Sequence, residues 1–337
     1  MKIVIDAFGG DNAPAEIVKG AILGLKENKD INIILTGNKQ VIQKILQEEN
    51  FSDNRLEIID AQDVITNDDV PTVAIRNKKD SSLVVAFDKL KQDDDVLGLI
   101  SAGSTGALLT GAILKIGRLK GVSRPAMCPI LPTVANNPVC ICDCGANADS
   151  KPINLCHFAL MAKEYYKAMF NVQNPRIALL NIGTEEHKGN ELVKETYKLL
   201  KDLPINFVGN MEARELLSGN YDIVVCDGFA GNVLLKSTEG AVLNVMNMLK
   251  ISIKSSKKSM FGALFMKKSF KNLKTKLDYS KYGGSPFLGC KKIVIKAHGT
   301  SKAENIKECI NQVIQLSKND YNKNIEESLQ NVQIKED

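Results

Sequence analysis

The chain has 337 residues, of which 44% are hydrophobic and 25% charged, the composition of an ordinary soluble globular protein. This length suits one large α/β domain or two smaller domains, and the composition excludes a disordered or collagen-like chain. No apolar run approaches the roughly 18 residues that cross a bilayer. Asp6 and Asp11 come too early to leave room for the apolar region of a signal peptide, so we expect a cytoplasmic protein.

The net charge of +5 is concentrated in one segment. Residues 250–281 contain ten lysines and one acidic residue, Asp278, whereas the rest of the chain is slightly acidic. A nucleic-acid partner needs a broader basic face and aromatic side chains for stacking, but the chain has no Trp and 5% aromatic residues. We therefore expect no nucleic-acid partner.

Short apolar runs that end in Gly- or Asp-containing turns alternate with amphipathic helical segments. In chain order, the runs and the helices that follow them are 2–11 and 14–27, 31–38 and 39–49, 96–106 and 107–119, 139–147 and 153–169, 176–190 and 191–201, 221–232 and 233–250, and 291–301 and 303–318. Apolar strands that alternate with such helices indicate βαβ units. The sequence therefore predicts an α/β fold with a mainly parallel sheet covered by helices on both faces.

The stretch 124–138, RPAMCPILPTVANNP, breaks this alternation with four prolines. Proline lacks the N–H that a central strand needs, so we expect a hairpin-like excursion there. No low-complexity linker separates two domains, so we expect residues 1–337 to form a single α/β unit.

The eight cysteines are expected to serve as small buried hydrophobic residues. A disulfide framework is not expected in a chain of this size without a signal peptide. Cys140, Cys142 and Cys144 are spaced C-x-C-x-C, and on a strand this spacing aligns three sulfurs on one face without converging on one ion. We therefore expect no metal site.

The polar turns that follow the predicted strands are the candidate ligand sites, because ligands of parallel α/β sheets bind beyond the carboxyl ends of the strands. The turn SAGSTGA begins at Ser101. Gly103 and Gly106 allow backbone N–H groups to approach an anion, and Ser104 and Thr105 add hydroxyl donors. A well-capped helix start explains the same residues without a ligand. The turn has neither the G-x-x-x-x-G-K-[ST] nor the G-x-G-x-x-G pattern of nucleotide sites.

Three other strand-end turns carry ionisable side chains. In NIGTEEHKGN, Lys188 stands among carboxylates such as Glu185 and could hold a phosphate or polarise a carbonyl, although a solvated charged turn explains it equally well. Asp227 precedes a glycine-flanked turn that ends in Asn232. A single histidine is more often structural than catalytic, but the place of His298 between a strand and a Gly-Thr-Ser turn favours a function.

A longer pattern runs through the chain. It consists of DAFGGDNAP (6–14), SAGSTGA (101–107), DCGAN (143–147), LLNIGTEEHKGN (179–190), FVGNMEARELL (207–217), VVCDGFAGNVLLK (224–236), LDYSKYGGSPFLG (277–289) and VIKAHGTS (294–301). Together these segments resemble the PlsX phosphate acyltransferases of bacterial phospholipid synthesis, and the resemblance covers essentially the whole chain. Ser104 replaces the usual Asn of the family, and Ala213 stands where the family more often has Gly.

The resemblance implies a three-layer α/β/α sandwich, similar to the phosphotransacetylase and isocitrate dehydrogenase-like folds, and a homodimer. It implies that an acyl-[acyl carrier protein] thioester reacts with inorganic phosphate to give an acyl phosphate and free acyl carrier protein. Phosphate is itself the nucleophile, so neither a catalytic triad nor a cofactor is expected. The site must instead bind the anion, orient it, stabilise a tetrahedral oxyanion and protonate the leaving thiolate.

Residue roles follow from this reaction as expectations. Catalytic roles are expected for Lys188, His298, Asp227 and Asn232. Lys188 is expected to hold phosphate together with the 101–107 turn, and His298 or Asp227 to handle the proton. Substrate-binding roles are expected for Asp6, Ser101, Gly103, Ser104, Thr105, Gly106, Asp143, Asn147, Glu185, Asn190 and Asn210.

Three other functions stay open. A phosphate acetyl- or butyryltransferase that uses acyl-coenzyme A would share the fold, although the motifs favour the carrier-protein enzyme. A metal-dependent decarboxylating dehydrogenase needs an Asp constellation and a nicotinamide site, and neither is evident. A non-enzymatic peripheral membrane scaffold would leave the strand-end polar clusters without a role.

Residues 250–281 are expected to form a basic amphipathic helical excursion. An apolar stripe with the spacing i, i+4, i+7 and i+11 consists of Met266, Phe270, Leu273 and Leu277. A second apolar cluster surrounds Gly262, where we expect the bend of a helical hairpin. That cluster consists of Phe261, Leu264 and Phe265, and it is followed by Lys267 and Lys268.

This excursion has three interpretations. It could form a dimer interface or a core helix with a solvated lysine edge. It could lie on an anionic membrane surface, with the apolar cluster inserted and each lysine contributing about 1 kcal/mol near the headgroups. It could also dock the acidic acyl carrier protein. Peripheral membrane contact suits the resemblance, because the acyl phosphate of the family is easily hydrolysed in water and passes to a membrane glycerol-3-phosphate acyltransferase.

Overall fold

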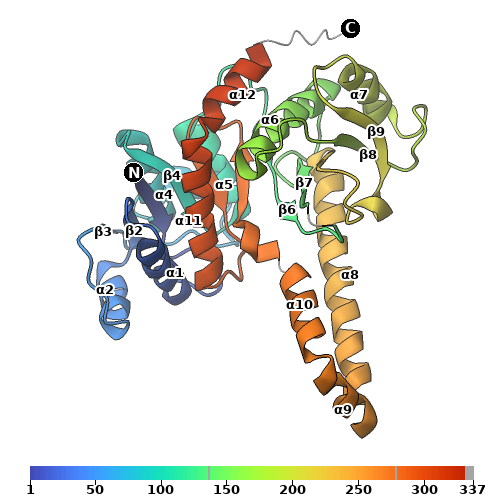
Figure 1. Cartoon of the computed structure of the whole chain (residues 1–337). Coiled ribbons are helices and arrows are strands. Elements are labelled where there is room, and N and C mark those ends of the chain that lie inside the picture. The colour runs from blue at the N-terminus through green and yellow to red at the C-terminus, as the bar shows by residue number, and fades with distance from the viewer. Residues whose placement is uncertain (136, 278, 331–337) are drawn as a thin grey trace.

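The computed structural model describes residues 1–135, 137–277 and 279–330, whose strands form two sheets (Figure 1). The first sheet has seven strands in the order β3 (Leu56–Asp60), β2 (Asn32–Gly37), β1 (Lys2–Asp6), β4 (Val96–Ser101), β12 (Ile293–Lys296), β11 (Ser285–Leu288) and β5 (Ala126–Met127). The second has five strands in the order β6 (Ile130–Leu131), β7 (Val139–Cys142), β10 (Ile223–Val225), β8 (Ile177–Asn181) and β9 (Phe207–Glu212). The sequence did not predict this division.

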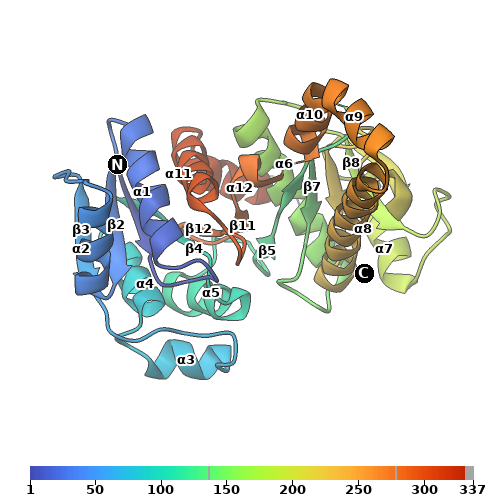
Figure 2. The ribbon, with the colours of Figure 1, turned by 90° about the horizontal axis from the view of Figure 1, so that it is seen from below.

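The first sheet is parallel from β3 to β12 and antiparallel at β11 and β5. Helices α1 (Ala15–Glu27) and α11 (Ala303–Lys318) cover one face, and α4 (Ser82–Gln92) and α5 (Thr105–Gly111) cover the other (Figure 2). Gly20 lets α1 approach α11 closely, since a Cβ at Gly20 would lie 2.5 Å from the Cβ of Ile306. This arrangement confirms the predicted α/β class, with a mainly parallel sheet between two helical layers.

The second sheet is parallel except at β6. Apolar side chains from α6 (Pro152–Phe170) and α7 (Glu191–Lys201) bury one face, and the first turns of α8 (Gly228–Lys254) bury the other. Further helices of the described residues are α2 (Lys39–Glu48), α3 (Pro71–Asn77), the π-helical turn Ala112–Ile116, the 3-10 turns Ala213–Glu215 and Tyr279–Tyr282, and α12 (Tyr321–Gln330).

The proline-rich stretch 124–138 connects the two sheets. Its strand β5 pairs with β11 of the first sheet, whereas its strand β6 pairs with β7 of the second. The described residues of this stretch therefore form a crossover, not the expected hairpin, because each short strand finds its partner in a different sheet.

The eight cysteines are buried and free, as small core residues should be. Cys140 and Cys142 belong to one hydrophobic cluster and Cys144 to the other, because β7 ends at Cys142. The expected row of three sulfurs on one face is therefore wrong. Among the described residues, no group of His, Cys, Asp or Glu side chains has the arrangement of a metal site.

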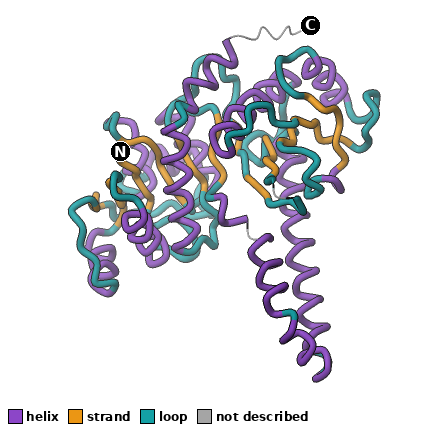
Figure 3. Tube along the Cα trace, in the orientation of Figure 1, coloured by secondary structure: helices purple, strands orange, loops and turns teal. Residues whose placement is uncertain are grey.

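The described part of the basic excursion is helical and projects from the body of the protein (Figure 1 and Figure 3). Helix α8 runs outward, α9 (Lys257–Phe265) forms the tip, and α10 (Lys267–Leu277) returns. Gly262 lies within α9, so the bend expected there is wrong: the breaks between helices fall at Ser255–Ser256 and at Met266. Of the helices in the described ranges, none combines the length and apolar character needed to cross a bilayer.

Candidate functional site

A cavity of about 730 Å³ lies where the two sheets meet. It is bounded by the turns after β4 and β12, by the crossover between the sheets and by the first turns of α8. Its volume is in the range of small-molecule sites, and its position beyond the carboxyl ends of parallel strands is where such sites form in α/β proteins. It is the candidate active site.

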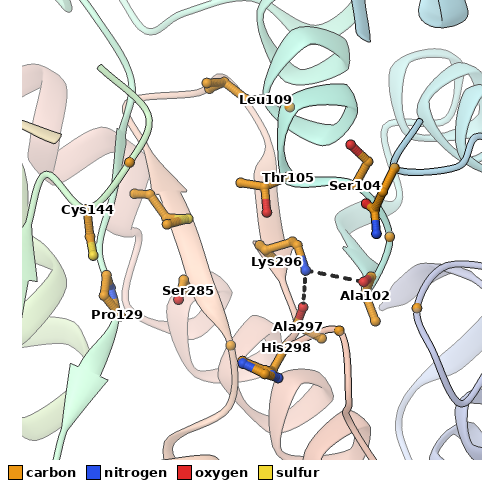
Figure 4. A pocket seen from close by; sticks show the side chains of 18 of the residues that line it. Ala102, Ser104, Thr105, Leu109, Pro129, Cys144, Ser285, Lys296, Ala297 and His298 are labelled. Carbon is orange, nitrogen blue, oxygen red and sulfur yellow. Dashed lines mark hydrogen bonds between the residues drawn. The ribbon is translucent and has the colours of Figure 1, made fainter. Parts of the chain in front are cut away.

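The predicted turn after β4 reaches this cavity. Gly103, Ser104, Thr105 and Gly106 all line it, and Figure 4 shows the side chains of Ser104 and Thr105. The backbone N–H of Ala107 donates to the Ser104 Oγ, which makes Ser104 the N-cap of α5. This bond uses Ser104 as an acceptor and leaves its O–H available as a donor.

Asp6 and Ser101 lie behind that turn and do not line the cavity. The Ser101 hydroxyl donates to Asp6 Oδ2 over 2.7 Å, and the Gly103 N–H donates to Ser101 Oγ over 3.0 Å. Burial raises the pKa of Asp6, which the hydrogen bonds from Ser101 and the Phe8 N–H partly oppose. Both residues therefore position the turn, and the expectation that they contact substrate directly does not fit this arrangement.

A residue that the sequence analysis missed occupies the floor of the cavity. Lys296, the last residue of β12, is 9% exposed, and its Nζ donates to the carbonyl oxygens of Ala102 (3.2 Å) and Ala297 (2.5 Å), as Figure 4 shows. Burial lowers the pKa of Lys296 to about 8. The available signal was a lysine directly after the apolar run IVI and before a glycine turn, a place where a charged side chain is unusual.

His298 follows Lys296 by two residues and also lines the cavity. Its Nδ1 accepts from the Thr300 N–H over 3.3 Å and lies 2.9 Å from the Thr300 hydroxyl. On the α8 side of the cavity, burial raises the pKa of Glu239, while the charges of His298 and Lys236 lower it. Glu239, on the helix α8 that packs on the second sheet, therefore interacts electrostatically with His298, which follows β12 of the first sheet.

Two residues of the DGFAGN motif have different surroundings. Asn232, on the first turns of α8, lines the cavity. Asp227 caps α8 by accepting from the Ala230 N–H over 2.9 Å, and it does not line the cavity. The proton-handling role expected for Asp227 therefore has no support in its position.

Asp143 and Asn147 are buried in the wall behind the cavity. Asp143 accepts hydrogen bonds from the backbone N–H groups of Met127, Cys144, Ala146 and Asn147. Burial raises the pKa of Asp143, and these N–H groups oppose that shift. Because Met127 and Cys144 line the cavity, the two polar residues hold its wall in place.

Lys188 and its neighbours lie at the strand ends of the second sheet and do not line the cavity. The Lys188 side chain is exposed, while its carbonyl accepts from Asn181 and the Glu185 carbonyl accepts from Asn210. Asn190 caps α7 through the Val193 N–H. The structure therefore does not bring Lys188, Glu185, Asn190 and Asn210 together with the 101–106 turn within one chain.

The cavity combines two chemical surfaces. The hydroxyls of Ser104 and Thr105 and the ammonium of Lys296 are donors in one part of the wall, and apolar side chains form another part. The apolar part includes Leu109, Met127, Ile130, Leu131 and Leu235. Such a cavity suits a ligand that is anionic at one end and hydrocarbon at the other.

Comparison with known proteins agrees with this chemistry. A family model described as "Fatty acid synthesis protein" matches residues 1–324. The chain is 47% identical over 333 residues to the phosphate acyltransferase of Clostridium tetani, with 99% of each chain covered. It is 51% identical over 319 residues to the phosphate acyltransferase of Clostridium acetobutylicum, with 95% of this chain and 96% of the relative covered.

Solved structures share the fold at low sequence identity. A phosphotransacetylase from Streptococcus pyogenes has a TM-score of 0.63 at 18% identity, with 94% of both chains covered. A branched-chain phosphotransacylase from Enterococcus faecalis has a TM-score of 0.56 at 15% identity, with 93% of this chain and 98% of that one covered. The predicted likeness to phosphotransacetylases is confirmed for the fold. Because the family model and the relatives match nearly the whole chain, the chain belongs to the fatty acid synthesis protein family, the PlsX family of phosphate acyltransferases that its motifs resemble.

Proposed function

We propose that this protein converts an acyl-[acyl carrier protein] and inorganic phosphate to an acyl phosphate and free acyl carrier protein. The observation that carries the proposal is the cavity, which sets anion-binding donors beside an apolar wall. Phosphate would bind at the donors, and the acyl chain would lie along the apolar part. Phosphate then attacks the thioester carbonyl, so that no nucleophilic side chain is needed.

The geometry changes the roles expected from the sequence. In this proposal the Ser104 and Thr105 hydroxyls hold phosphate or the oxyanion, and Lys296 supplies positive charge from the floor of the cavity. Asn232 and His298, which both line the cavity, are proposed to orient the thioester. The role of Lys188 stays a prediction, and within one chain it has no contact with this cavity.

A thioester assay tests the reaction. Purified protein is given phosphate with a long-chain acyl-[acyl carrier protein], with short and long acyl-coenzyme A, or with NAD and a hydroxy acid. We expect phosphate-dependent loss of the carrier-protein thioester and formation of acyl phosphate. Turnover of short acyl-coenzyme A alone would favour the acetyl- or butyryltransferase, and absence of all turnover would favour the scaffold.

We also propose that the tip of the helical excursion binds an anionic membrane surface from the cytoplasmic side. Phe261, Leu264 and Phe265 are 65%, 66% and 80% exposed, and Lys267 and Lys268 begin the next helix. Apolar side chains next to lysines are the pattern of interfacial helices, and membrane contact would bring the acyl phosphate to a membrane glycerol-3-phosphate acyltransferase.

Vesicle flotation tests this contact. Binding should be stronger to anionic than to neutral vesicles and should weaken with salt, and Phe261→Asp or Leu264→Asp should reduce it without loss of activity in solution. Val172→Asp, at an exposed apolar residue of the body, is the control. Equal flotation with both vesicle types would favour the alternative that the excursion forms a dimer interface or docks acyl carrier protein. Light scattering tests the homodimer, which remains a prediction.

A further inference from the structure

Lys296 is held in one place by the backbone around it. Its ammonium donates to two carbonyls, those of Ala102 after β4 and Ala297 after β12. A lysine ammonium has three donors, so one N–H is left after these two bonds. Figure 4 shows the side chain beneath Thr105, on the floor of the same cavity. This third donor is available to a substrate in the cavity.

The reaction requires the transfer of one proton, and balancing its atoms shows which group loses the proton and which group gains it. The phosphate dianion, HPO4²⁻, forms a bond to the carbonyl carbon as the carbon–sulfur bond breaks. The acyl phosphate product no longer carries the phosphate proton, and the product thiol has gained one. One group that gives a proton to sulfur and takes one from phosphate would complete this exchange without net change to the protein.

We propose, on the basis of the function proposed above, that Lys296 is a catalytic residue that relays this proton from phosphate to the leaving thiolate. The ammonium donates a proton to the sulfur as the carbon–sulfur bond breaks. The neutral amine then takes the proton of the phosphoryl group and is ready for another turnover. Its two carbonyl partners keep the nitrogen in place in both states.

The acid strength of Lys296 suits this task. Burial brings its pKa to about 8, and the ordinary pKa of a thiol is about 8.5, so transfer between them is nearly balanced in free energy. Other charged or titratable groups surround the site. They are Asp6 and Asp11 near β1, Cys309 on α11, His298 after β12, and Lys236 and Glu239 on α8. His298 is the rival proton donor, but it is exposed and its Nδ1 interacts with Thr300.

The pH dependence of turnover tests the relay. The donor form of Lys296 is the ammonium, so wild-type turnover should fall as the pH rises through about 8. Lys296→Arg keeps the charge but does not lose its proton in this range, so it should be slower and lack that fall. Lys296→Met should lose on the order of 10²–10⁴-fold in turnover, the usual contribution of general acid–base catalysis. Lys291→Met, at an exposed lysine outside the cavity, should behave as wild type.

The leaving group provides a second readout. An aryl thiolate leaves without a proton, so an aryl thioester of the same fatty acid should restore most of the turnover of Lys296→Met relative to wild type. If Lys296 only binds phosphate, Lys296→Met should lose turnover equally with the carrier-protein thioester and with the aryl thioester, and its KM for phosphate should rise. That result would overturn the relay. If the decrease of turnover near pH 8 disappears in His298→Ala but persists in Lys296→Arg, then His298 and not Lys296 donates the proton. The pH profile decides the question whether or not the aryl thioester is a substrate.

Failure of the relay and failure of the proposed function are distinct results. If the wild-type protein turns over acyl-[acyl carrier protein] with phosphate and Lys296→Met does so equally well, the relay is wrong and the function stands. If the folded wild-type protein turns over neither thioester, the proposed function is wrong and the relay fails with it. Circular dichroism of each variant checks that the chain is folded.

Discussion

Two strand-end turns look alike in the sequence and differ in the structure. The turn 101–106 follows β4 in the first sheet, and the turn 181–190 follows β8 in the second. Only the first lines the cavity. Both are polar and both follow buried strands, so residue type does not separate them. What separates them is the sheet to which the preceding strand belongs, and that depends on pairing between distant segments.

The largest effect is expected from the donors of the first turn. Ser104→Ala combined with Thr105→Val removes two hydroxyl donors from the cavity. It also removes the Ser104 cap of α5, so circular dichroism checks that the variant is folded. Loss of one preorganised oxyanion donor usually lowers the rate by about 10²–10³-fold, and we expect at least that loss in phosphate-dependent turnover. Ser218→Ala, on the second sheet's side of the protein and outside the cavity, is the matched control. Turnover within a few-fold of wild type would place the anion elsewhere.

The second turn is tested by mixing variants. Lys188 does not reach its own cavity, so a strong loss in Lys188→Ala requires that it act on the cavity of another copy. We then expect an inactive Lys188→Ala protein mixed with an inactive Lys296→Met protein to regain about a quarter of wild-type turnover, because half of the dimers are mixed and each holds one complete site.

Three outcomes of this mixing are informative. Recovery would place the 181–190 turn at an interface between copies. No recovery from two inactive proteins would mean that Lys188 acts within its own chain, contrary to its position outside the cavity. Full activity of Lys188→Ala by itself would show that the turn is a solvated loop.

A smaller effect concerns stability. The pKa of Lys296 is lowered from 10.5 to about 8 in the folded protein, so the buried ammonium destabilises the fold at neutral pH by on the order of 3 kcal/mol. Lys296→Met should therefore melt at a higher temperature than wild type at pH 7. The unfolded chain holds this proton up to higher pH than the folded one, so wild type should gain stability between about pH 8 and pH 10 and the difference should narrow. A difference in melting temperature between wild type and Lys296→Met that does not change with pH would contradict the presence of a buried charge.

The sequence predicted much of the site, for reasons that individual residues make clear. The 103–106 turn, Asn232 and His298 line the cavity because a strand end fixes their place in an α/β fold. Asp6 and Asp143 also lie at strand ends, but their side chains point into the protein, and a linear pattern does not show on which side of the backbone a carboxylate lies. Lys296 was missed because a lysine that ends a strand usually reaches solvent.

Some elements of the fold were not predicted from the sequence. Residues 56–92 add β3, α3 and α4, which the alternation of runs and helices did not reveal. The sequence predicts the bend of the excursion at Gly262, yet glycine is tolerated inside α9 and the helix breaks at Ser255–Ser256. A serine at the start of a helix is a stronger signal than a glycine within it, since Ser256 accepts the Ser259 N–H as the cap of α9.

The length of helix α8 also sets the distance between the cavity and the tip of the excursion. It lines the cavity as far as Glu239 and continues without a break to Lys254, a further 15 residues, which correspond to about 22 Å at 1.5 Å per residue. With the tip inserted in a membrane and the helix upright, the cavity would stand above the headgroups by about that height. The acyl phosphate would then leave the enzyme into a thin layer of water, and its hydrocarbon chain would have to be shielded or handed over across that gap. A protein that leans toward the surface, with its cavity mouth lowered, would shorten this passage.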